Sequence, residues 1–158
     1  LREQGRVEQS IELEVPVSTV YDQWTQFEEF PKFMEGVEEV RQLVPGRLQW
    51  VTVVAGRRRA WEVEIELHPD ERVAWHATSG KANSGVVTFH RLSDARSKVM
   101  VQMQFEPEGL RQRLGSRLGI DSRRVKGDLE RFKSLIESRQ HASGAWRGDI
   151  EHGDVTQT

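Results

Sequence analysis

The alternation of apolar and polar residues between positions 61 and 68 restricts the fold more than any other feature of this sequence. In chain order the residues are Trp61, Glu62, Val63, Glu64, Ile65, Glu66, Leu67 and His68. Successive side chains of a β-strand point to opposite faces, so this stretch predicts a strand with one buried face and one solvated, acidic face. The apolar face of the sheet that contains it needs a second layer to cover it.

Six other stretches also have the character of strands. The second clearest covers residues 97–106, with Val99, Val101, Met103 and Phe105 on one side. The first strand is expected within residues 7–15 and ends before Pro16. The remaining runs are expected near 37–44, 47–55, 71–79 and 84–92, with the run that contains Trp61 covering 58–68. Short turn signals separate consecutive runs after residue 37, which favours antiparallel neighbours.

Helical patterns occur at two places in the chain. Between the first two strands, Ser18 is a candidate N-cap for a short helix, and the apolar cluster around Pro31 favours a second short helix or turn. The longer pattern begins near Asp121 or Ser122. Its apolar stripe consists of Val125, Leu129, Phe132 and Ile136. This helix is the only predicted element long enough to cover the sheet, and it is too narrow to fill a strongly curved one, so an interior space is expected.

The order of these motifs resembles a known family. The matching stretches are Val15 to Tyr21 ahead of Trp24, Phe30 to Met34 followed by Val37, Trp61 to Ile65, Val73 to Trp75, Gly85 to Phe89 and Val125 to Lys133. Together they resemble the START-like or SRPBCC superfamily, in particular its bacterial polyketide cyclase/dehydrase and lipid-transport branch, related to coenzyme Q-binding proteins. The resemblance implies an α+β helix-grip fold, in which a seven-stranded antiparallel curved sheet wraps around a long C-terminal helix and two short helices follow the first strand. It implies a hydrophobic pocket but no particular reaction.

We expect residues 1–140 to form one ligand-binding domain and residues 141–158, rich in Gly, Ser, Asp, Thr and Gln, to form a flexible tail. The tryptophans of the strands, the parity of the inward faces and the helix stripe give the residues expected to line the cavity, with Phe33 at its mouth. They are Phe33, Trp50, Trp61, Val63, Ile65, Trp75, Phe89, Met103, Phe105, Val125, Leu129 and Phe132. Each of these aromatic residues also has a simpler interpretation as core packing, whereas as a group they suit the wall of a pocket for a flat or oily ligand.

Polar candidates for the pocket are few. Tyr21 is the only tyrosine, Thr52 shares the parity of Trp50, and Arg91 shares the parity of Phe89. We assign catalysis to none of them, because an arginine at a strand end is usually solvated. The histidines lack a metal-ligand spacing and the glycine-rich stretches lack a phosphate-binding pattern, so no metal and no cofactor are expected.

Composition limits the partners and the compartment. The formal net charge of -2 gives no field to recruit nucleic acid, and the absence of cysteine fits a cytoplasmic protein.

Three functions remain open: binding or carrying a hydrophobic small molecule or lipid-like ligand, an aromatase/cyclase-type reaction on a polyketide-like substrate, and a lipid-presenting module that docks on a membrane or partner. The last rests on arginines at 57–59, 111, 113, 117, 123 and 124, which allow a transient contact with a membrane surface. The oligomeric state is left open.

Overall fold

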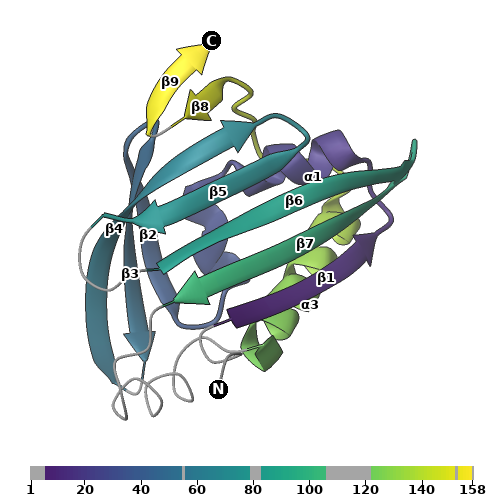
Figure 1. Cartoon of the computed structure of the whole chain (residues 1–158). Coiled ribbons are helices and arrows are strands. Elements are labelled where there is room, and N and C mark those ends of the chain that lie inside the picture. Colours follow the sequence, from purple (N-terminus) through teal and green to yellow (C-terminus); the bar gives the residue numbers. More distant parts are fainter. Residues whose placement is uncertain (1–5, 55, 79–82, 106–121, 152, 158) are drawn as a thin grey trace.

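The computed structural model describes residues 6–54, 56–78, 83–105, 122–151 and 153–157 (Figure 1). Its elements in chain order are β1 (Arg6–Leu13), α1 (Val17–Trp24), the 3-10 helix η1 (Phe27–Lys32), β2 (Val37–Val44), β3 (Arg47–Val54), β4 (Arg57–His68), β5 (Arg72–Ala77), β6 (Asn83–Ser93), β7 (Arg96–Phe105), α3 (Ser122–Arg139), β8 (Asp149–Glu151) and β9 (Asp154–Gln157). No described helix is long and apolar enough to cross a membrane.

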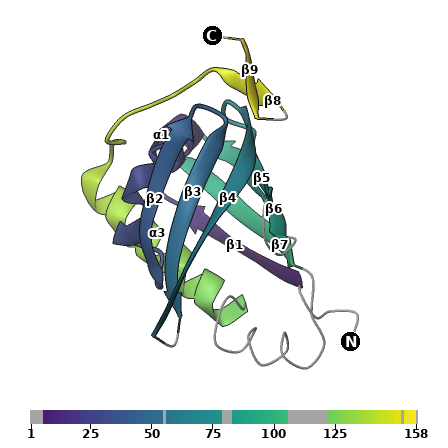
Figure 2. The same cartoon turned by 90° about the vertical axis from the view of Figure 1, so that its left-hand side faces the viewer.

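The main sheet has the strand order β1-β7-β6-β5-β4-β3-β2, and all of these neighbours are antiparallel. In Figure 1, β2 and β3 run steeply across the direction of β6 and β7, so the sheet is strongly curved. Figure 2 shows α1 and α3 together on one side of it. The predicted α+β architecture, with two short helices after the first strand and one long helix covering an antiparallel sheet, is confirmed.

The core lies between the inner face of the sheet and the apolar stripe of α3. On β4, Val63, Ile65 and Leu67 are buried, whereas the glutamates between them are partly exposed, as the alternation predicts. On α3, the predicted stripe of Val125, Leu129, Phe132 and Ile136 is buried. Both sets of side chains belong to one buried apolar cluster, and their burial is the main hydrophobic contribution to folding.

Polar contacts fix the position of α3 on the edge strand β1. The Glu14 amide donates a hydrogen bond to Glu137 Oε2 (2.8 Å), and Lys133 Nζ donates to the same carboxylate oxygen (2.8 Å) and to the Glu12 carbonyl (2.9 Å). Partial burial of Glu137 acts to raise its pKa, but the two hydrogen bonds and the charge of Lys133 outweigh burial, and the net pKa is lowered.

We therefore expect Glu137→Gln to lower the free energy of unfolding by about 1 kcal/mol at pH 7. A carboxylate whose pKa is depressed on folding contributes stability above its unfolded pKa and loses it as the pH falls through the folded pKa. The difference between variant and wild type should thus shrink between pH 7 and about pH 3. Urea titrations at both pH values measure it, with Glu130→Gln on the exposed side of α3 as control. A difference that does not change with pH would contradict this account.

The segment after α3, for which the composition predicts a flexible tail, makes hydrogen bonds to residues of α1 and to Thr25 in the structure. The side chain of Gln23 in α1 is 1% exposed, and its Oε1 accepts hydrogen bonds from Arg139 Nη1 (3.2 Å) and the Ser143 amide (2.9 Å). The Trp146 amide donates to Thr25 Oγ1 (3.2 Å). Figure 2 shows this segment passing over α1 towards β8. Ser143 and Trp146 therefore attach this segment to α1 and to Thr25, the residue that follows it.

Beyond Trp146 the chain joins the sheet. Ile150 on β8 lies opposite Leu67 of β4 and is fully buried. Strand β3 begins at Arg47, which lies opposite Glu64 of β4. Strand β8 pairs with the same edge of β4 further along, at Leu67. The composition of residues 141–158 offers little to bury beyond Trp146 and Ile150, and the structure buries the Ile150 side chain beside β4. That residues 1–140 form the ligand-binding domain remains a prediction.

Candidate functional site

The inner face of the sheet divides into a closed part and a partly open part. In the closed part, near α1, Leu67, Val73 and Phe89 are at most 5% exposed. In the other part, side chains of the same faces pack against the core but stay only partly buried. They are Trp50, Trp61, Trp75, Ala77 and Met103. Tryptophan is a costly residue to leave partly in water, so this part of the face is where a ligand gains most by binding.

An aromatic cluster fills the space between α1, η1 and α3. Ring centroids of Trp24 and Phe132 are 4.8 Å apart, those of Phe33 and Phe132 are 5.1 Å apart, and Trp24 lies 6.2 Å from Phe89. Phe33, Phe89 and Phe132 were expected to line the cavity, with Phe33 at its mouth. The structure instead places Phe33 inside the cluster, 2% exposed, because η1 turns its ring towards Trp24 and α3.

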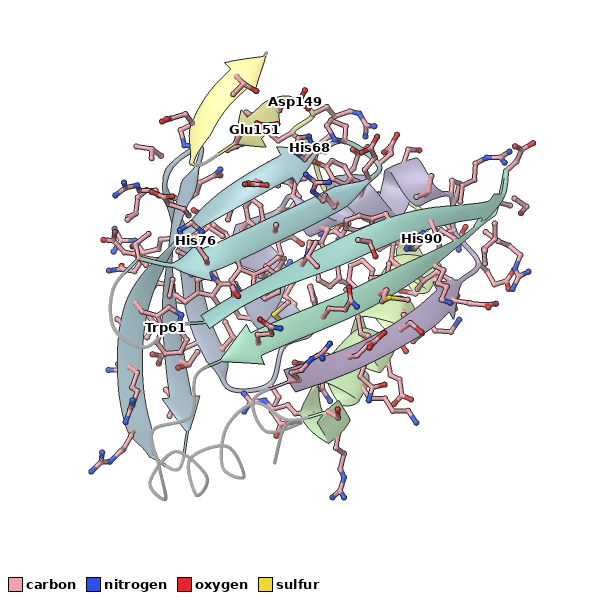
Figure 3. The ribbon with its side chains drawn as sticks, viewed as in Figure 1. Trp61, His68, His76, His90, Asp149 and Glu151 are labelled. Atoms are coloured by element: carbon pink, nitrogen blue, oxygen red, sulfur yellow. The ribbon has the colours of Figure 1, made fainter. Side chains whose placement is uncertain are left out.

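The partly buried tryptophans lie on three adjacent strands. Trp50 of β3 is directly opposite Trp61 of β4, and Trp75 of β5 is opposite Gly85 of β6. A Cβ at Gly85 would lie 2.4 Å from Trp75 Cζ2, so the glycine leaves the space that the indole occupies. Figure 3 labels Trp61 on β4, well away from His68 and Asp149 at the other end of the sheet. Trp61 and Trp75 lie on the face that their parity indicated, and Trp50 shares this face because it lies opposite Trp61; their role in lining a cavity stays a prediction.

Two polar groups accompany these tryptophans on β3. The Trp50 Nε1 atom is buried and has no hydrogen-bond partner among the described residues. Thr52, two residues further on and therefore on the same face, is 9% exposed. The sequence suggested an inward Thr52, and the structure places it there, but no sequence signal reveals that the indole N–H of Trp50 lacks an acceptor.

Tyr21 lies in the closed part of the core. Its ring packs edge-on against Phe89 at 5.3 Å, the residue is fully buried, and its hydroxyl has no described partner. Arg147 from the C-terminal segment covers the ring, with its guanidinium carbon 5.5 Å from the ring centroid, and pairs with Asp70 at 2.6 Å. Burial raises the pKa of Tyr21 far above its ordinary value, although the charge of Arg147 opposes this, so the phenol stays protonated.

Arg91, which shares the parity of Phe89, does not share the burial of Phe89 in the structure. Its side chain is 60% exposed and forms an ion pair with Asp94 in the hairpin between β6 and β7. The β6–β7 hairpin extends beyond the part of the sheet that the helices cover. Arg91 therefore lies on the same face as Phe89 but is exposed to solvent.

The described histidines of the sheet do not form a metal site. Figure 3 shows His76 and His90 on the face of the sheet opposite α3, and both are exposed. His76 Nε2 lies 3.6 Å from Glu64 Oε1, and His68 Nε2 lies 3.6 Å from Glu151 Oε2. Within the described ranges, no group of three or more His, Asp or Glu side chains is arranged to hold a metal ion.

The other predicted site residues fall into two groups. Val63, Ile65, Val125 and Leu129 are buried core residues. The side chain of Phe105 and the arginines at 111, 113 and 117 lie outside the described residues. An open hollow on the surface beside α3 is lined by Lys32, Gly127, Glu130, Arg131, Ser134 and Leu135. Four of these six residues have polar or charged side chains, and none of the partly buried tryptophans is among them.

Comparisons with known proteins agree with this architecture. A family model described as polyketide cyclase/dehydrase and lipid transport matches residues 13–134. An uncharacterised 17.2 kDa protein of Streptomyces lincolnensis is 52% identical over 148 residues, which cover 92% of this chain and 99% of that protein.

Two solved structures share the fold at low sequence identity. A START superfamily protein from Mycobacterium smegmatis is 15% identical, with a TM-score of 0.61 over 85% of this chain and 95% of that one. The Zhui aromatase/cyclase from a Streptomyces species is 16% identical, with a TM-score of 0.58 over 85% of this chain and 87% of that one.

Proposed function

Because this chain belongs to the polyketide cyclase/dehydrase and lipid transport family and has a START-like fold, we propose that it binds a hydrophobic small molecule or lipid-like ligand between the inner face of the sheet and α3. The observation that carries the proposal is the partial burial of Trp50, Trp61 and Trp75 on adjacent strands of that face. On the same strands and the same face, Leu48, Val63 and Val73 are at most 3% exposed, so burial becomes incomplete only beyond these residues.

The chemistry of this region suits an apolar ligand. Indole rings offer a large, rigid apolar surface, and burial of that surface contributes about 25 cal/mol per Å². Met103 adds a flexible side chain that adapts to ligand shape. Thr52 and the Trp50 N–H supply the few polar contacts that orient a ligand in such pockets.

Native mass spectrometry of the purified protein, followed by denaturing extraction, tests the proposal. We expect an apolar molecule to leave with the protein, or the empty protein to bind the neutral fluorescent probe N-phenyl-1-naphthylamine. Trp61→Ala should weaken probe binding about tenfold, because it removes a large contact surface. Leu92→Ala, at an exposed apolar residue of the β6–β7 hairpin, is the control and should leave binding unchanged. A protein that carries no apolar molecule and binds no probe would contradict the proposal.

A cyclase-type reaction is the alternative that the family leaves open, and one solved relative is described as an aromatase/cyclase. Such a reaction needs polar side chains that orient a poly-ketone chain and accept a proton. Arg91 is exposed and ion-paired, and Tyr21 stays protonated. Neither residue therefore supplies a general base at neutral pH, and binding is the function that the described residues support best.

A further inference from the structure

The open part of the inner face changes in polarity along β3 and β4. Directly opposite residues in an antiparallel pair share a face. Trp50 lies opposite Trp61, and the next pair on the same face joins Thr52 with Arg59. The face therefore passes from two aromatic side chains to a hydroxyl and then to an exposed guanidinium.

Each polar group in this series can donate a hydrogen bond. The Trp50 indole N–H is a donor only, the Thr52 hydroxyl donates or accepts, and the Arg59 guanidinium is a permanently charged donor. Among the described strands, Trp50 Nε1 is the one buried side-chain polar atom of the inner face without a partner. An unpaired buried donor costs about 1–3 kcal/mol, so a ligand oxygen that accepts this bond is favoured.

Arg59 differs from the arginine next to it. Arg58 lies on the opposite face and is held by Glu38 through two hydrogen bonds of 2.8 Å. Among the described residues, Arg59 makes no ion pair, so its charge is available at the edge of the part of the inner face that contains Trp50 and Trp61. A positive charge at this position favours an anionic group over a neutral one.

We infer that the ligand is an amphipathic carboxylic acid, with its apolar body against Trp50 and Trp61 and its carboxylate at the rim, near Thr52 and Arg59. The inference rests on the proposed function and adds the chemical class of the ligand. In this arrangement Trp50 N–H and Thr52 bind ligand oxygen, and Arg59 distinguishes the acid from a neutral ester.

Three fluorescent probes with the same dansyl group and alkyl length test the inference. They are 11-(dansylamino)undecanoic acid, its methyl ester and N-dansyl-undecylamine, which lacks the terminal oxygens. Wild-type protein is expected to bind the acid about threefold to fivefold more tightly than the ester. It should bind the ester about fivefold more tightly than the undecylamine.

Three variants assign these preferences to residues. Arg59→Gln should remove the preference for acid over ester, whereas the matched control Arg58→Gln should keep it. Trp50→Phe and Thr52→Val should each reduce the preference for the oxygenated probes while leaving undecylamine binding within about twofold. Thermal unfolding of each variant checks that the fold is retained.

The outcomes separate the two proposals. If all three probes bind wild-type protein with equal affinity, apolar binding stands and the acidic ligand class is wrong. If the acid is preferred but Arg59→Gln keeps that preference, the role of Arg59 is wrong. If none of the probes binds, the proposed function fails together with this inference.

Discussion

Replacing Phe132 by alanine is expected to lower the free energy of unfolding by about 3–5 kcal/mol. The side chain is fully buried at the centre of α3, and its ring packs against Trp24 at 4.8 Å and Phe33 at 5.1 Å. The substitution removes both the buried apolar surface and the aromatic contacts, and the cavity that it leaves adjoins three rigid elements, which limits relaxation.

Chemical denaturation followed by circular dichroism measures this loss. Leu135→Ala is the matched control, because Leu135 lies on the same helix and is only partly buried against the core. The control should cost clearly less than Phe132→Ala, since less apolar surface is removed. Equal losses for the two variants would mean that the aromatic cluster does not centre on Phe132.

The sequence was enough to predict the fold, because the signals for the fold are repeated. The alternation around Ile65 identified β4 and its buried face, and the four-residue spacing from Val125 to Leu129 identified the face of α3 that packs on the sheet. These patterns reflect the geometry of strands and helices, which is independent of what covers them. The order of the elements then left few arrangements with both faces buried.

The candidate site was predicted less completely, because parity fixes the face of a residue and not its depth. Trp61 and Arg91 were both assigned to the inner face by the same reasoning, yet one lines the aromatic region and the other lies in an exposed hairpin. Depth depends on where α1, η1 and α3 cover the sheet, which is a property of tertiary packing. For the same reason Phe33, expected at an entrance, is part of the aromatic cluster.

The contacts of the C-terminal segment could not be predicted from the sequence, for a different reason. Its composition is that of a flexible tail, with little apolar surface to bury. Its anchoring depends on partners that are far away in the chain, such as Gln23 for Ser143 and the Asp22 and Asp70 carboxylates for Arg147. No local pattern around residue 147 contains this information.

Ile150→Ala decides whether this segment contributes to the stability of the domain. Ile150 is fully buried and lies opposite Leu67 of β4, so we expect the substitution to cost about 2–5 kcal/mol. Val155→Ala, on the same hairpin at a residue that is 38% exposed, should change stability by no more than about 0.5 kcal/mol. Urea titrations of both variants compare them directly.

If the two substitutions have equally small effects, residues 141–158 add no stability and the domain ends near residue 140, as the composition suggests. If only Ile150→Ala is costly, the segment is part of the cooperative unit, because a frayed segment would not transmit the loss of one side chain to global unfolding. In that case the position of Arg147 over the Tyr21 ring is part of the cooperatively folded structure. The C-terminal segment then covers the closed part of the core together with α1.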